Sequence, residues 1–104
     1  MKEGVIGYIP TASKHEAMML AAELLEKKLI ACANVFEGVS MFVWQDKQRK
    51  ENECLLLVKT SHELYDEMSE AVKELHSYDL ACIIKIPVQM DDDYYAWLEE
   101  QVKG

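Results

Sequence analysis

The sequence of 104 residues predicts an α+β fold in which a four-stranded sheet packs against helices. Runs of apolar and β-branched residues typical of strands occur in four places along the chain. Two stretches with apolar residues at helical spacing separate these runs, and a third, shorter one ends the chain. The predicted order is therefore strand, helix, strand, strand, helix, strand, helix.

The first strand is expected over Val5–Ile9, a nearly all-apolar run that Pro10 should end. A helix should begin at Ser13, because Ser13 and Glu16 have the spacing of a capping box, in which each side chain bonds the other residue's backbone amide. The apolar residues that follow recur at intervals of three and four: Ala17, Leu20, Ala21, Leu24 and Leu25. This spacing predicts one apolar stripe packed against the sheet.

A long second strand is expected over Ala31–Trp44, which lacks helical periodicity and is rich in Val, Phe and Trp, with Glu37-Gly38 as a bulge or bend. The entirely polar segment Gln45–Asn52 should be a solvated connection to a third strand at Glu53–Val58. Together these segments predict a hairpin.

The second half of the chain repeats the pattern of the first. Thr60 and Glu63 again have capping-box spacing, and a second apolar stripe follows at Leu64, Met68, Ala71, Val72 and Leu75. A fourth strand is expected over Leu80–Val88, ending near Pro87. Asp91–Asp93 should then cap a short final helix that reaches Val102.

With right-handed crossovers, this order folds most simply into an antiparallel sheet of strand order 4-1-3-2 with both main helices on one face. That is the ferredoxin-like βαββαβ sandwich, here with a short C-terminal helix, and the length predicts a single domain over residues 1–104. The long second strand would lie at a sheet edge that needs covering. Phe36, Met41, Phe42 and Trp44 along it favour a partner chain, most simply further copies of the same chain.

Composition excludes some classes of partner. Acidic residues outnumber basic ones by 19 to 11, and the net charge of −8 repels phosphate backbones, so nucleic acid is not an expected partner. There is no pattern of a signal peptide and no apolar stretch of membrane-spanning length, so we expect a soluble, cytoplasmic protein without membrane contact. Cys32, Cys54 and Cys82 are odd in number and lie among apolar neighbours, which favours buried thiols over disulfides.

Several segments, in order and spacing, resemble the CutA family of divalent-cation tolerance proteins: Lys28–Val35, Trp44, Lys47, Glu53, Lys59-Thr60, Leu75–Asp79, Tyr94 and Trp97. The resemblance covers nearly the whole chain. It implies a tight homotrimer formed through sheet edges, a link to tolerance of copper and other divalent metals, weak metal binding and no catalytic activity or obligatory cofactor. It also implies a likeness to the PII signalling proteins in fold and trimer architecture.

The chain departs from the family pattern at positions linked to metal chemistry. Family members can carry a cysteine at the end of the first strand and two adjacent histidines before the fourth, where this chain has Ile9 and Leu75-His76. A usual Pro-Glu pair after Tyr78 is replaced by Ala81-Cys82, and a usual hairpin glycine by Asp46. Most of the copper site that the resemblance implies is therefore missing.

Two residues are the candidate metal ligands. Cys82 would offer a soft thiolate to Cu(I) or Zn if the intervening loop brought it close to His76. Each residue also has a structural explanation: the imidazole of His76 would be favoured at the C-terminal end of a helix, and Cys82 would be a core thiol.

Six further residues are candidates for a ligand pocket between subunits. Four aromatic side chains would line it, and two lysines would contact a small anionic ligand: Trp44, Tyr78, Tyr94, Trp97, Lys47 and Lys59. Packing at an interface is the alternative explanation for the aromatic residues.

The leading functional hypothesis is a trimeric, non-enzymatic protein of metal tolerance, with a PII-like small-molecule sensor or a trimeric scaffold as alternatives. A copper chaperone of this topology would need two cysteines in the first strand-to-helix loop. An acyl-phosphate hydrolase would need an arginine there. The segment Pro10–Ser13 contains neither residue type, which argues against both.

Overall fold

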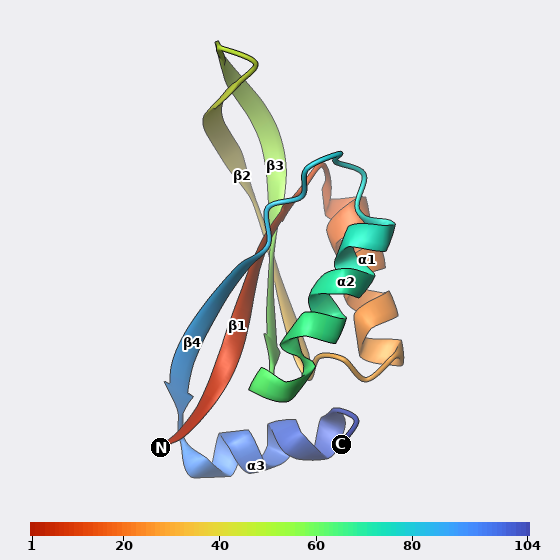
Figure 1. The fold of residues 1–104 in the computed structure, drawn as a ribbon, viewed down its shortest axis with the longest axis vertical. Helices are drawn as coiled ribbons and strands as arrows, with labels where there is room; N and C mark the ends of the chain where they lie inside the picture. The colour runs from red at the N-terminus through yellow and green to blue at the C-terminus, as the bar shows by residue number, and fades with distance from the viewer.

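The computed structural model describes all residues from 1 to 104 and contains one four-stranded sheet and three α-helices (Figure 1). The elements follow in the predicted order: β1 Lys2–Thr11, α1 Lys14–Glu26, β2 Cys32–Trp44, β3 Lys47–Thr60, a 3-10 turn at His62–Leu64, α2 Tyr65–Leu75, β4 Ile84–Met90 and α3 Asp92–Gln101.

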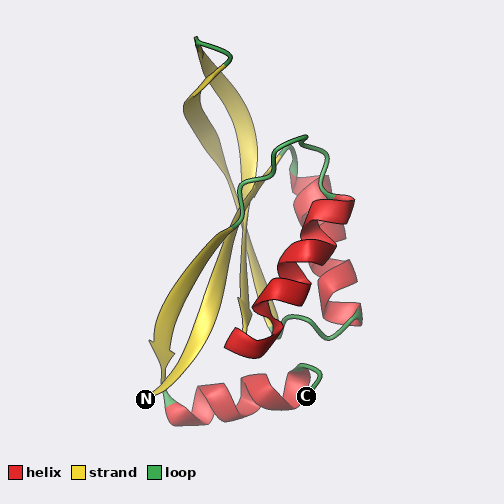
Figure 2. Ribbon diagram, viewed as in Figure 1, coloured by secondary structure: helices red, strands yellow, loops and turns green.

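The sheet is antiparallel throughout and has the order β2-β3-β1-β4, which is the predicted order read from the other edge. Helices α1 and α2 lie side by side on one face, and α3 crosses the end of the sheet near the N-terminus (Figure 2). The ferredoxin-like topology predicted from the sequence is thus confirmed. Strands β2 and β4 form the two edges.

The main core fills the space between the sheet and the pair of helices. Its fully buried side chains alternate along the central strands and recur along both helices: Val5, Ile9, Leu56, Val58, Leu20, Leu24, Met68 and Val72. Gly7 lies in the same layer, where a Cβ atom would stand 2.7 Å from Cγ2 of Val58 and 3.2 Å from Cε of Met68. The missing side chain therefore lets α2 approach β1 closely.

The first capping prediction is confirmed in outline. Ser13 is the N-cap of α1, and its hydroxyl accepts a hydrogen bond from the amide of Glu16 at 3.1 Å. The Glu16 carboxylate reaches back one residue further than a capping box requires and accepts from the amide of Ala12 at 2.8 Å. Both contacts hold the end of β1 against the start of α1.

The other two capping predictions need correction. Thr60 is the last residue of β3, and its hydroxyl donates to the carbonyl of Leu29 at 2.7 Å instead of capping α2. Asp91 occupies the N-cap position of α3 but makes no side-chain cap bond. The carboxylate of Asp92 instead pairs with the amino terminus of Met1 at 3.1 Å.

Strand boundaries also differ from the prediction. β1 does not end at Pro10 but continues to Thr11, with Pro10 opposite Leu55 of β3. On its other side β1 is paired with β4 only as far as Tyr8. Pro10, which has no amide hydrogen, therefore loses no hydrogen bond to a neighbouring strand on that side. The predicted first four residues of β4 lie in the preceding loop, and β4 runs from Ile84 through Pro87 to Met90.

The hairpin is longer and more regular than predicted. Residues of β2 and β3 pair one to one from Cys32 to Trp44, so the expected bulge at Glu37-Gly38 is absent. The polar segment forms strand from Lys47 onward, and only Gln45 and Asp46 turn the chain, with φ values of 52° and 63°. Left-handed residues at both positions are typical of a two-residue hairpin turn. The segment Gln45–Asn52 is therefore polar because it lies in an exposed, projecting hairpin, and not because it is a loop (Figure 1).

Candidate functional site

The sheet face that points away from α1 and α2 is largely uncovered and apolar; we call it the open face. Side chains alternate across a sheet, so residues between the buried positions of each strand point to this face. On it, Phe36 is 54% exposed, Ile84 48% and Ile86 38%. The projecting hairpin adds Phe42 and Trp44 to this face, whereas its exposed Val39, Met41 and Val43 alternate with them and point to the other side.

Two adjoining hollows, of about 350 and 510 Å³, lie where the hairpin passes the loop between α2 and β4. Together we call them the Trp44–Tyr78 cleft. Phe42, Trp44, Tyr78 and Leu80 line both hollows. The smaller hollow also contains Asp79, and the larger contains Glu53, Cys82 and the start of β4.

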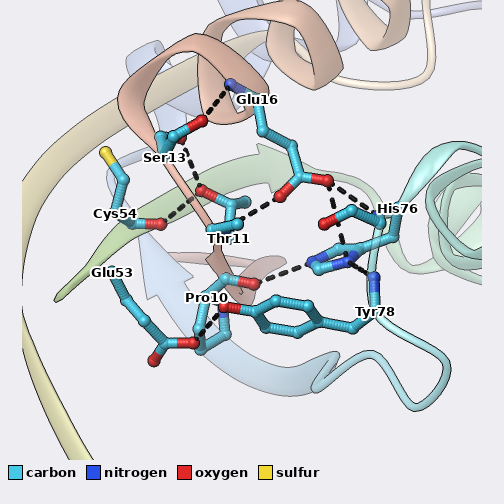
Figure 3. A network of polar contacts seen from close by, with 10 residues as sticks. Pro10, Thr11, Ser13, Glu16, Glu53, Cys54, His76 and Tyr78 are labelled. Carbon is cyan, nitrogen blue, oxygen red and sulfur yellow. Dashed lines mark hydrogen bonds and ion pairs between the residues drawn. The ribbon is translucent and has the colours of Figure 1, made fainter. Parts of the chain in front are cut away.

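The imidazole of His76 anchors the loop that forms one wall of this cleft (Figure 3). Its side chain is fully buried. Nε2 lies 2.8 Å from the carbonyl oxygen of Pro10, and Nδ1 accepts a hydrogen bond from the amide of Tyr78 at 3.1 Å. Because one nitrogen faces an acceptor and the other a donor, we assign the proton of a neutral ring to Nε2.

The carboxylate of Glu16 secures the same loop from α1. It accepts hydrogen bonds from the amides of Ala12 and Ser77, the latter at 2.7 Å, and lies 3.9 Å from Nδ1 of His76. Burial alone would raise the pKa of Glu16, but the hydrogen bonds from Ala12 and Ser77 favour the carboxylate, so its pKa is lowered. The ionised form of Glu16 is therefore part of the folded structure.

Tyr78 joins this network to the hairpin. Its hydroxyl donates to Oε2 of Glu53 on β3 at 2.6 Å, and its ring lies 4.8 Å from the ring of His76 (Figure 3). Burial, the hydrogen bond to Glu53 and the charges of Glu53, Glu16 and Glu51 all raise the pKa of Tyr78. The phenol therefore stays neutral, and its aromatic face borders the cleft.

The two predicted metal ligands have different surroundings. His76 uses both ring nitrogens in hydrogen bonds to backbone atoms, so metal coordination would have to break one of them. It does not cap α2 through the helix carbonyls either, since its ring bonds to β1. No group of three or more His, Cys, Asp or Glu side chains in the chain is arranged to hold a metal ion.

The predicted burial holds for one cysteine of three. Cys54 is buried in the core, Cys32 is half-buried, and Cys82 is exposed at the cleft because the predicted strand around it is a loop. Partial burial and the negative charge of Glu53 raise the pKa of Cys82. The sequence could not separate these environments, because all three cysteines have apolar neighbours in the chain.

The six predicted pocket residues fall into two groups within one chain. Trp44 and Tyr78 line the cleft, and Lys47 is opposite Trp44 in the hairpin without lining it. The other three meet at α3: the ammonium of Lys59 lies 5.7 Å from the ring centre of Tyr94, which is 5.4 Å from that of Trp97.

The prediction missed two of the four residues that line both hollows. It named Phe42 only as an apolar residue of the edge strand, and it did not name Leu80 as a site residue. The alternation of Phe42 with Trp44 is the one signal that could have placed both side chains on the same face of the hairpin. For Leu80, which lies in an irregular loop, the sequence holds no comparable signal.

This geometry defines a ferredoxin-like domain with a projecting hairpin and an uncovered sheet face. The model of the CutA1 divalent ion tolerance protein family matches residues 5–101. The chain therefore belongs to the CutA1 family.

Two similar proteins match over nearly their full lengths. The divalent-cation tolerance protein CutA of Archaeoglobus fulgidus is 39% identical over 97 residues, which are 92% of this chain and 95% of that protein. The CutA of Pyrococcus horikoshii is 36% identical over 100 residues, 95% of this chain and 98% of that protein. A crystal structure of CutA1 from P. horikoshii superposes with a TM-score of 0.93 at 35% identity, covering 96% of this chain and 99% of that one.

The three helices are too short or too polar to cross a membrane. None of them has the length and apolar composition that a membrane-spanning helix needs.

Proposed function

We propose that this protein is a non-enzymatic homotrimer that acts in tolerance of copper and other divalent metal ions. Membership of the CutA1 family supports the link to divalent ions, and the family is named for tolerance and not for a reaction. The observation that carries the proposal of self-association is the open face with its projecting hairpin.

The open face needs a partner for energetic reasons. Monomeric soluble proteins rarely expose a large continuous apolar patch. Here one face of the sheet exposes Ile84 and Ile86 on β4 and Phe36 on β2, and the hairpin adds Phe42 and Trp44. A hairpin of two strands is marginally stable on its own in water. Further copies of the chain would both cover the patch and support the hairpin.

The two edges of the sheet favour a ring over a symmetric dimer. β2 is a 13-residue edge and β4 a 7-residue edge, so the two are unlike. Contacts between unlike surfaces repeat from one copy to the next and form a closed ring when the rotation closes. The resemblance to CutA proteins supports three as the number of copies.

The mass in solution tests this assembly. We expect light scattering at micromolar concentration to give three times the 12.0 kDa mass of the chain. A mass equal to that of one chain would contradict the proposal.

For direct metal binding we propose Cys82 as the ligand and assign His76 to the structure of the loop. The thiol of Cys82 is exposed, whereas both nitrogens of His76 are engaged. Because only the thiolate binds metal well and the pKa of Cys82 is raised, binding should be weak at neutral pH and strengthen as the pH rises.

Titration of the reduced protein with Cu(I) and Zn(II) checks this assignment. We expect Cys82→Ser to lower the affinity about tenfold or more, as loss of a thiolate ligand should. Cys54→Ser is the matched control, because Cys54 is buried in the core and cannot reach the same ion. Equal affinities of Cys82→Ser and the unchanged protein would refute the role of Cys82.

We place the protein in the cytoplasm. Support comes from its three cysteines, none of which forms a disulfide, since free thiols are usual in a reducing compartment.

A further inference from the structure

The solvent side of α1 carries a second apolar row, separate from the one that faces the core. Met18, Ala22 and Leu25 follow one another at spacings of four and three, so they lie on one side of the helix. All three are exposed, Met18 at 55% and Leu25 at 45%. None of them belongs to the core between the helices and the sheet, so folding alone does not account for this row.

The exposed side of α2 and of the turn before it has the opposite character. Five acidic residues and one lysine point to solvent there: Glu63, Asp66, Glu67, Glu70, Lys73 and Glu74. This segment therefore has a net charge of −4, half of the net charge of −8 of the chain. The ion pairs of Glu70 with Lys73 and of Glu67 with Lys103 lie at exposed positions and leave the segment acidic.

Contacts at both ends hold the two helices side by side and antiparallel. At one end, the carboxylate of Glu16 on α1 accepts a hydrogen bond from the amide of Ser77, just after α2. At the other end, Lys103 donates its amide to the carbonyl of Lys28 and its ammonium to the carboxylate of Glu67. The apolar row of α1 and the acidic side of α2 thus belong to one surface (Figure 2), which we call the helix surface.

The border between the two helices is apolar and adaptable. Met19 is three residues after Glu16, which points to α2, so Met19 lies between the apolar row and α2. On α2, Ala71 is four residues after Glu67 and is half-buried against the core. Methionine side chains are flexible and adapt their shape to a partner. The border can therefore accommodate apolar side chains of more than one shape.

We propose that the helix surface binds a basic amphipathic α-helix of a partner protein. Apolar side chains of that helix would pack on Met18, Ala22 and Leu25, and its Lys or Arg side chains would face Glu70 and Glu74. Helices that bind in this way present apolar anchors at spacings of three and four, which is also the spacing of the row on α1. Opposite charges across the contact speed association and select the partner. This interaction goes beyond the proposed role in metal tolerance.

The position and charge of the helix surface favour this occupant over two others. An anionic lipid surface attracts basic residues and would repel the acidic side of α2. A second copy of the chain, docked through the same surface, would place like charges opposite each other. The open face lies on the other side of the sheet, so self-association through it would leave the helix surface accessible on each copy.

Three designed peptides test the chemistry of the partner. The first has about 18 residues of Leu and Lys, with Leu at the spacing of an amphipathic helix. The second has Glu in place of each Lys, and the third is a scrambled form of the first that keeps its charge and loses its apolar face. In fluorescence anisotropy at physiological salt, we expect saturable binding of the first peptide and at least about tenfold lower affinity of the others. No binding of the first, or equal affinity for its scrambled form, would overturn the proposal.

An apolar substitution locates the contact on α1. Leu25→Gln should weaken binding of the first peptide about threefold to tenfold, because apolar area is then no longer buried at the contact. Leu80→Gln makes the same change at an exposed leucine in the loop before β4 and is the matched control. Equal affinities of these two variants would refute the helix surface as the site.

Charge substitutions locate the acidic side of the contact. Glu70→Gln and Glu74→Gln together should weaken binding of the first peptide about threefold to tenfold, an effect that added salt reduces. Glu99→Gln and Glu100→Gln together remove the same charge from exposed positions on α3 and should have a smaller effect. Equal weakening by the two pairs would show general attraction to an acidic protein and contradict the proposed site.

Light scattering on the same samples separates this proposal from that of self-association. A trimer that does not bind the first peptide would refute the partner site alone. A protein with the mass of one chain, whose peptide binding Leu25→Gln weakens, would refute the assembly alone.

Discussion

At the scale of single residues, Glu16 and His76 fix the loop that borders the cleft. Each reaches backbone atoms far away in the chain: Glu16 binds the amide of Ser77, and His76 binds the carbonyl of Pro10. Buried polar groups of this kind stabilise a fold only when they are fully satisfied. No buried side-chain nitrogen or oxygen in the chain lacks a hydrogen-bond partner.

The lowered pKa of Glu16 predicts how stability depends on pH. In the unfolded chain the carboxyl takes up a proton near its ordinary pKa of 4.5, whereas the folded protein holds the carboxylate to lower pH. Between these two values the unfolded state binds more protons, so the free energy of unfolding falls as the pH is lowered. Above the ordinary value the stabilisation is fully present.

Urea unfolding between pH 3 and pH 7 measures this contribution. We expect Glu16→Gln to be less stable than the unchanged protein at pH 7 and to approach it as the pH falls through the acidic range. Glu26→Gln, at the exposed end of α1, is the control and should keep the full pH dependence. A difference between Glu16→Gln and the unchanged protein that stays constant from pH 7 to pH 3 would contradict the role of Glu16.

At the scale of elements, the packing of α2 against β1 depends on the absence of a side chain at Gly7. A Cβ atom there would meet Val58 and Met68 at distances that require one of them to move. Both neighbours are fully buried, so they have little room to shift. The close approach of the helix to the sheet is therefore tied to this position.

Gly7→Ala should lower the free energy of unfolding by about 1 to 3 kcal/mol, the usual cost of overpacking a core. Gly38→Ala is a matched control, since Gly38 lies in β2 with no atom within 4 Å of a new Cβ. Urea unfolding of both variants checks the difference. The explanation fails if the two substitutions have the same effect.

Element order and topology could be predicted because hydrophobic periodicity reports which face of a segment is buried. The apolar spacing from Ala17 to Leu24 gave α1 correctly for that reason. Periodicity says little where no face is buried, which is why the exposed strand Lys47–Asn52 looked like a loop. The cleft escaped prediction for a different reason: the bond from Tyr78 to Glu53 joins residues 25 positions apart, and nothing in the local sequence marks it.

At the scale of the whole molecule, two features support the proposed association. The molecule is elongated, 45 by 25 by 21 Å, because the hairpin projects beyond the region covered by α1 and α2 (Figure 1). Its open face exposes apolar side chains, although the chain as a whole is acidic, with a net charge of −8. Burial of the open face between copies is the central claim about this protein.

A comparison of masses by light scattering tests that claim most directly. Phe36→Asp places a charge on the open face, and Leu25→Asp places one on an exposed apolar position of α1, on the other side of the sheet. At the same micromolar concentration, we expect the unchanged protein and Leu25→Asp to have three times the mass of the chain, and Phe36→Asp to have a lower mass. A single-chain mass for the unchanged protein, or a full trimer mass for Phe36→Asp, would contradict association through the open face.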